Sequence, residues 1–170
     1  LHYKDGAGNW LSIQASPERN NRNPRLVEMN RSDLPISVNT ENGVSTMFLK
    51  ENRMISFGES AKVLWMDKNN AVNKATVQSS SIANHSLNAD ILLLKDIFPG
   101  VDRKQAMNYD HLQTDYIINQ AVNLPASVEY LVFEDYLKLP ANWNIKYGSG
   151  EMTPAGWKGD LLIMDEQNAV

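Results

Sequence analysis

The stretch DRKQAMNYDHLQTDYIINQAV, residues 102–122, decides the fold class that the sequence predicts. Its apolar side chains recur at helical spacing, at Ala106, Tyr109, Leu112, Tyr116, Ile117 and Ala121. Asp102 is placed to cap the first turn, with Gln105 in the reciprocal position of a capping box. Pro99-Gly100 precedes the stretch and Leu124-Pro125 follows it, and such residues are typical of element boundaries. We therefore expect one principal helix around residues 102–122.

The residues before this stretch are typical of strands joined by turns. Pro35–Asn39 and Val44–Lys50 flank Glu41-Asn42-Gly43, whose Asn-Gly pair is a strong hairpin signal. Ala61–Met66 and Ala71–Gln78 form a second candidate hairpin. Together these patterns predict antiparallel pairing over much of the first half of the chain.

Shorter apolar or β-branched runs occur in the second half. Val128–Phe133, Trp143–Tyr147 and Asp160–Met164 favour strands, and Ile91–Leu94 favours a buried strand or a short helix. Strand and helix patterns do not alternate regularly, which argues against a doubly wound parallel sheet. We expect a single α+β domain over residues 1–170, mainly an antiparallel sandwich or curved sheet with the one helix packed against it.

Composition excludes several functional classes. The 170 residues include 16 Lys and Arg against 20 Asp and Glu, a net charge of −4 that does not suit bulk nucleic-acid binding. There is no cysteine, so disulfides, Cys-ligated zinc and thiol nucleophiles are excluded. No apolar run approaches the roughly 20 residues of a membrane-spanning helix. We expect no cofactor, no nucleic acid and no membrane span. The sequence begins at Leu1, which is typical of a processed product, and we expect an extracytoplasmic location or an assembled particle.

Charge is distributed unevenly along the chain. Residues 1–85 hold 10 basic and 8 acidic groups, net +2, whereas residues 86–170 hold 6 and 12, net −6. The sharpest basic feature is a set of four arginines, Arg19, Arg22, Arg25 and Arg31. They indicate an exposed loop that is either simply solvated or a contact for an acidic partner. The acidic second half of another copy is one such partner.

Two tryptophans stand in polar or loop-like settings. Trp143 lies between Asn142 and Asn144, and Trp157 follows Pro154-Ala155-Gly156. Such a tryptophan either caps the edge of a core, anchors a protein interface or stacks on a sugar ring. We keep Trp143, Asn144 and Trp157 as the candidate ligand-binding residues of the glycan interpretation.

Signals for catalysis are weak. Gly148-Ser149-Gly150 lacks the spacing of a hydrolase nucleophile elbow. His111 and Asp115 would share a face of the expected helix, but two ligands are a weak metal signal, and we predict no metal site. Adjacent carboxylates such as Glu134-Asp135 point to opposite faces of a strand, although Glu134 with Asp160 could still form an acid–base pair. We assign no catalytic residue.

These observations favour a non-enzymatic structural or protein-interaction subunit, of the kind found in surface appendages, secretion apparatus or virions. Its expected partners are other proteins or further copies of itself, and a contact between a basic loop and an acidic face would give rings or filaments. A glycan-binding module is the first alternative. A carboxylate-dependent glycan hydrolase is the second, so the sequence leans away from an enzyme without deciding the question.

Overall fold

The computed structural model describes most of the chain in eleven segments. These are residues 2–4, 7–12, 16–30, 34–49, 52–59, 61–67, 72–78, 84–108, 111–120, 126–153 and 156–167. In these segments the chain forms sixteen β-strands, all paired antiparallel, and no α-helix. None of these residues belongs to a helix that is long and apolar enough to cross a membrane.

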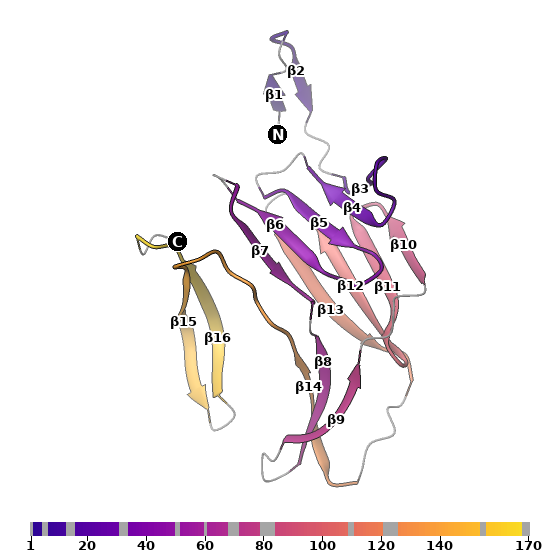
Figure 1. Cartoon of the computed structure of the whole chain (residues 1–170), viewed down its shortest axis with the longest axis vertical. Coiled ribbons are helices and arrows are strands. Elements are labelled where there is room, and N and C mark those ends of the chain that lie inside the picture. Colours follow the sequence, from indigo (N-terminus) through magenta and orange to yellow (C-terminus); the bar gives the residue numbers. More distant parts are fainter. Residues whose placement is uncertain are drawn as a thin grey trace.

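Two sheets lie face to face and form a β-sandwich (Figure 1). The first sheet has the order β3 (Glu18–Arg19), β4 (Leu26–Met29), β5 (Ile36–Asn39), β6 (Ser45–Phe48) and β7 (Met54–Phe57). The second has the order β10 (Asn84–Asn88), β11 (Ile91–Phe98), β12 (Val101–Met107) and β13 (Leu112–Ile118). Because each strand follows its neighbour in sequence, both sheets are simple meanders.

The core fills the space between these two sheets. Its fully buried apolar side chains come mainly from β4, β5, β11 and β12: Val27, Met29, Ile36, Val38, Leu92, Leu94, Ile97, Phe98, Val101 and Met107. Alternation explains the pattern, since every second residue of a strand points to the same face. Together these side chains provide the hydrophobic stabilisation of the sandwich.

A third sheet continues the sandwich at one end (Figure 1). Its order is β14 (Val128–Glu134), β8 (Lys62–Asp67) and β9 (Val72–Gln78). Val63 of β8 joins the buried cluster, and Phe133 of β14 stacks on Tyr116 with ring centroids 4.1 Å apart. The third sheet is therefore packed onto the sandwich through aromatic contacts.

Two hairpins extend away from this body (Figure 1). One pairs β1 (His2–Lys4) with β2 (Trp10–Ser12). The other pairs β15 (Asn144–Thr153) with β16 (Gly156–Met164), and we call it the ribbon. The ribbon stands beside the sandwich rather than joining either of its sheets.

The prediction of one principal helix around residues 102–122 is wrong, and so is the prediction of the α+β class, because the described residues form β-strands and no α-helix. The described part of this stretch forms β12 and β13, which pair antiparallel from Val101↔Ile118 to Met107↔Leu112. Leu112 and Tyr116 both pack against the core, but a spacing of four fits a strand face as well as a helix face. On β12 the inward positions include Arg103 and Gln105, and these polar residues hide the alternation.

Asp102 performs a different task from the expected helix cap. Its Oδ1 accepts a hydrogen bond from the Asp96 backbone N–H at 2.9 Å. Asp96 has a φ of 52° and lies where the pairing of β11 with β12 is interrupted by a bulge. The carboxylate therefore satisfies an amide that the bulge leaves out of the ladder.

Both hairpins predicted in the first half are confirmed. β5 pairs with β6 across the Asn42-Gly43 turn, where Gly43 has a φ of 73°. The Asn39 side chain accepts the backbone N–H groups of Glu41 and Asn42 at 2.9 and 3.3 Å. β8 pairs with β9 as the second expected hairpin. The strands expected near Ile91, Val128, Trp143 and Asp160 are also present, as β11, β14, β15 and β16.

A buried arginine connects the two sheets of the sandwich. Arg103 points inward from β12, is 2% exposed, and donates from Nη2 to the Gly43 carbonyl oxygen on the opposite sheet. Burial lowers the pKa of its guanidinium, and a hydrogen bond with the Tyr116 hydroxyl and the charge of Asp135 act in the opposite direction. Gly58 adjoins this group, because a Cβ there would lie 2.9 Å from Arg103 Nη1. Arg103 therefore fixes how the sheets are placed over one another.

Candidate interaction surface

One face of the ribbon carries a continuous apolar strip. Its members are Ile145, Tyr147, Met152, Trp157, Leu161 and Ile163, which we call the apolar strip. In the antiparallel register Ile145 pairs with Ile163, Tyr147 with Leu161 and Met152 with Trp157. Directly paired residues project to the same face of a hairpin, and Trp157, Leu161 and Ile163 lie an even number of residues apart on β16. The six side chains therefore share one face, although the register shifts between Tyr147 and Gly150.

Glycines shape the middle of the strip. A Cβ at Gly150 would lie 2.7 Å from Cζ2 of Trp157, so the indole ring occupies the space above that glycine. Trp157 also stacks on Tyr147, with ring centroids 4.8 Å apart and planes 22° from parallel. Its Nε1 donates to the Asp160 carbonyl oxygen at 3.0 Å. The two rings are therefore held in a fixed arrangement along the strip.

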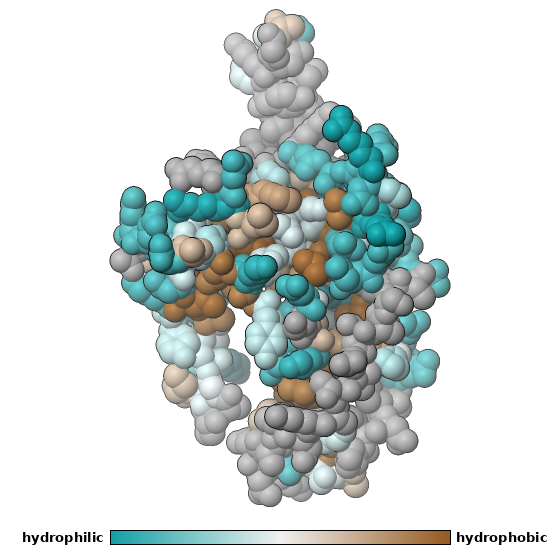
Figure 2. Space-filling view, in the orientation of Figure 1, coloured by the Kyte–Doolittle hydropathy of each residue, from teal (hydrophilic) through white to brown (hydrophobic). Residues whose placement is uncertain are grey.

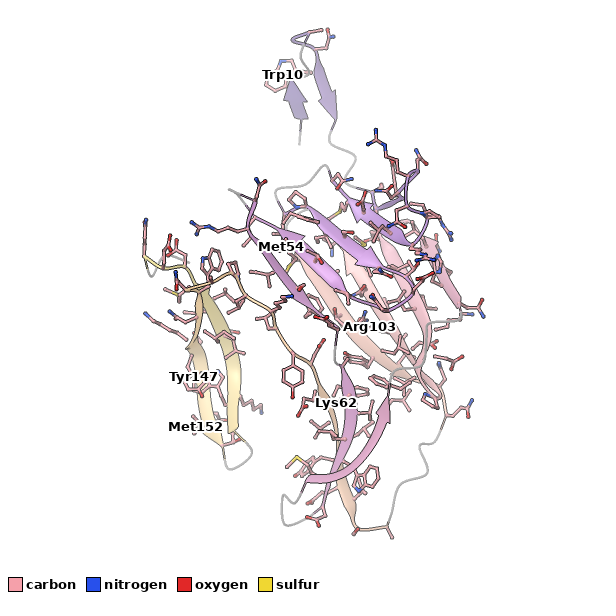
Figure 3. All side chains as sticks on the ribbon, in the orientation of Figure 1. Trp10, Met54, Lys62, Arg103, Tyr147 and Met152 are labelled. Carbon is pink, nitrogen blue, oxygen red and sulfur yellow. The ribbon has the colours of Figure 1, made fainter. Side chains whose placement is uncertain are left out.

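The strip is exposed to solvent along most of its length. Tyr147 is 62% exposed and Leu161 is 54% exposed. Met152, near the end of the ribbon that lies away from its base, is 64% exposed. Figure 3 shows Tyr147 and Met152 on the ribbon, at the side of the molecule. A contiguous apolar patch of this kind on a folded chain is a candidate interaction site.

The ribbon is attached to the sandwich at its base. The Arg53 guanidinium, next to β7, lies 5.6 Å from the centre of the Trp143 ring. Arg53 Nη2 also lies 3.4 Å from Oε1 of Glu166, just beyond β16. Nearby, Ser56 of β7 and Lys138 exchange two backbone hydrogen bonds, of 3.0 and 2.7 Å. These contacts fix where the ribbon leaves the body while its strip stays uncovered.

The structure places three of the four predicted arginines at one end of the first sheet. Arg19 lies on β3, Arg22 and Arg25 lie in the loop before β4, and Arg31 is outside the described residues. Hydrophilic side chains gather over this part of the surface (Figure 2). The Asn20 side chain shapes the loop by accepting the backbone N–H groups of Arg22 and Asn23, both at 2.8 Å.

This end of the sheet carries charges of both signs. Arg25 Nε lies 2.8 Å from Oε1 of Glu41, in an exposed ion pair. Arg19 and Arg22 line a polar groove together with Glu18 and Glu28. The Glu28 carboxylate accepts a hydrogen bond from the Asn20 side chain at 2.6 Å. The folded chain thus places three carboxylates beside the arginines, of which only Glu41 is distant in sequence, and the basic character of the loop is reduced.

The three residues of the glycan interpretation are separated. Trp143 and Asn144 lie at the base of the ribbon, whereas Trp157 pairs with Met152 towards the far end. Met152 lies eight positions after Asn144 on an extended strand, a distance of about 25 Å. Only Trp157 belongs to the apolar strip, so these residues do not converge on one sugar ring.

The weak catalytic candidates also occupy separate places. Glu134 on β14 lies 3.6 Å from Lys62 Nζ, whereas Asp160 lies on β16 in a different sheet. His111 and Asp115, four residues apart along an extended segment, are separated by about 13 Å. Asp115 instead lies 3.5 Å from Lys104 Nζ. Among the described residues, no three His, Asp or Glu side chains are grouped to hold a metal ion.

Comparison with protein-family models, with curated proteins and with solved structures gave no match. The interpretation of the site therefore depends on its own geometry. Of the six residues of the apolar strip, only Trp157 was among the site residues predicted from the sequence. The sequence does contain a signal for several of the others. Ile145 with Tyr147, and Trp157 with Leu161 and Ile163, follow the period of two that predicts one face of a strand.

Proposed function

We propose that the chain is a non-enzymatic structural or protein-interaction subunit that acts through surface contacts with other proteins, its own copies included. The observation that carries this proposal is the apolar strip on a ribbon that stands outside the sandwich. The subunit would be of the kind that builds a surface appendage, a secretion apparatus or a virion.

The composition of the strip supports a protein partner. Tyrosine, tryptophan and methionine are enriched at the centres of protein interfaces, and Tyr147, Trp157 and Met152 all lie on the strip. Isolated two-stranded hairpins are marginally stable in water, so a partner that covers one face would stabilise the ribbon. Covering the strip would also remove exposed apolar surface from water, which favours association.

The solution mass of the chain tests this proposal. We expect light scattering to give a mass that grows beyond 19.1 kDa as the protein concentration rises. The growth should persist when surface charges are screened by salt, because apolar contacts are not weakened by screening. A strict monomer at every concentration would contradict self-association.

A glycan-binding module remains the second candidate, because the exposed Tyr147 ring stacked on Trp157 offers an aromatic face to a sugar. Under that alternative, sugars would bind a monomeric chain, and Trp157→Ala would abolish the binding. Under the proposal, Trp157→Ala weakens association between chains and no sugar binds. A glycan array with the wild-type chain and this variant separates the two functions.

A further inference from the structure

We infer that the apolar strip packs face to face on the apolar strip of a second copy, with the two ribbons running antiparallel about a twofold axis. This inference rests on the proposed function and names its partner and its contact surface. Each ribbon would then cover the apolar strip of the other. The two sheets of the sandwich cover each other's apolar faces in the same way.

The area of the strip suits such a dimer. Ile145, Tyr147, Met152 and Leu161 are between 42% and 64% exposed, and together they present on the order of 400 Å² to solvent, within the range of the largest patch on a monomer. Two strips packed together would bury about 800 Å² from these four side chains, and the half-buried Trp157 and Ile163 would bring the contact towards about 1,000 Å², the lower limit for a specific interface. An area of this size suits a weak dimer whose population grows with concentration.

The charge pattern of the ribbon suits its own copy. No member of the apolar strip is charged, so two identical strips can meet without bringing like charges together. The charged residues of the ribbon pair across its strands or face the other way. Glu151 lies opposite Lys158, and Lys146 lies opposite Leu162 on the reverse face. A strip of this kind is complementary to itself and does not select a partner by charge.

The order of side chains along the strip favours antiparallel packing. Trp157 and Met152 occupy the far end, and Ile145 and Ile163 occupy the end near the base. An antiparallel arrangement places the large aromatic end of one copy on the smaller aliphatic end of the other, which fills space evenly. Tyr147 and Leu161, in the middle of the strip, then lie close to the twofold axis.

The segment that carries Arg19, Arg22 and Arg25, which we call the arginine loop, is a weaker candidate for the contact between copies. Arg25 is already paired with Glu41 in the same chain, and Glu18 and Glu28 lie in the same groove as Arg19 and Arg22. An acidic face of another copy would meet both signs of charge there. The loop therefore lacks the net positive field that would steer such a partner.

Single-cysteine cross-linking tests the geometry, because the chain has no cysteine of its own. Leu161→Cys places one thiol in the middle of the strip, and a short bis-maleimide should link it to its counterpart and give a covalent dimer. Ile118→Cys is the matched control, since Ile118 is 49% exposed on β13, away from the ribbon. It should give no covalent dimer under the same conditions. Equal cross-linking at both positions, or none at Leu161→Cys, would overturn the inference.

A charge placed on the strip tests its energetic role. Leu161→Glu should weaken self-association about tenfold or more in sedimentation equilibrium, because two carboxylates would meet near the axis. Leu161 is largely exposed, so the circular dichroism spectrum and the thermal midpoint should match those of the wild type. If association of the wild-type chain persists undiminished in Leu161→Glu, the strip is not the contact, whereas the proposed function as an assembling subunit stands. If the wild-type chain never associates, the inference is overturned, and the proposed function then requires a different protein as the partner.

Discussion

The sandwich and the ribbon use the same strand alternation with opposite outcomes. In the sandwich, Leu94 and Phe98 of β11 are covered by the facing sheet and are almost completely buried. In the ribbon, Tyr147 and Leu161 lie on an equally apolar face, yet more than half of each is exposed. A strand pattern thus defines which face is apolar, but the cover for that face depends on a second layer. We propose that another copy provides that layer for the ribbon.

The largest expected difference between the two regions is in the energetic effect of truncating an apolar side chain. Phe98→Ala should lower the free energy of unfolding by about 3–5 kcal/mol, because it leaves a cavity in the core. Leu161→Ala should change the stability of a dilute monomer by less than about 0.5 kcal/mol, since the side chain is largely exposed. Urea denaturation of both variants measures the comparison. Similar losses would mean that the ribbon is as covered as the core.

The polar connection inside the sandwich has the next largest effect. Arg103→Met should cost roughly 2–4 kcal/mol, because the Gly43 carbonyl and the Tyr116 hydroxyl lose a partner in a buried site. Lys104→Met is the neighbouring control. It removes only the partly exposed pair with Asp115, worth about 0–1 kcal/mol. If the two variants were equally stable, Arg103 would not be holding the sheets together.

Arg103 also explains why the sequence misled the prediction of fold class. Arg103 and Gln105 point inward from β12. These inward positions would be apolar in the alternating pattern that identifies a strand, so the pattern is not visible in the sequence. Leu112 and Tyr116, four residues apart, then fit a helix and a strand equally well. The hairpins could be predicted because their signal is local. The Asn42-Gly43 turn needs a positive φ at Gly43, and that requirement is visible in the sequence.

The candidate site could be predicted only in part, for a similar reason. The sequence indicates Trp157 as a candidate ligand-binding residue, and it belongs to the strip. Its companions Met152 and Leu161 join it only through the register of β15 with β16, which the sequence alone does not define. In the arginine loop, Glu41 lies 16 residues from Arg25 in sequence, and only the fold of β4 and β5 brings the two together.

A substitution inside the ribbon should affect the ribbon and spare the sandwich. A Cβ at Gly159 would collide with the carbonyl oxygen of Ser149 on the opposite strand. We expect Gly159→Ala to speed limited proteolysis within residues 144–164 several-fold, while the thermal midpoint of the sandwich stays unchanged. Ser149→Ala, at an exposed position in the same part of the ribbon, is the control. A lowered midpoint in Gly159→Ala would mean that ribbon and sandwich unfold together.

The smallest expected effect is a pH dependence at one edge of the sandwich. Burial lowers the pKa of His85 on β10, and the nearby charge of Arg19 lowers it further. A depressed pKa in the folded state gives stability that is present above the unfolded value of 6.5 and is lost as the pH falls. Unfolding curves between pH 7.5 and 5 should show this loss in the wild type and a smaller one in His85→Gln. Identical pH profiles would contradict it.

The most direct test of dimerisation through the apolar strip is sedimentation equilibrium of the wild-type chain and of Leu161→Glu, each at low and at high salt. Apolar contacts between strips predict a wild-type dimer at both salt concentrations and a monomeric variant at both. A wild-type dimer that dissociates in high salt would point to charged contacts instead. A dimer that survives the glutamate would show that the ribbon is not where two copies meet.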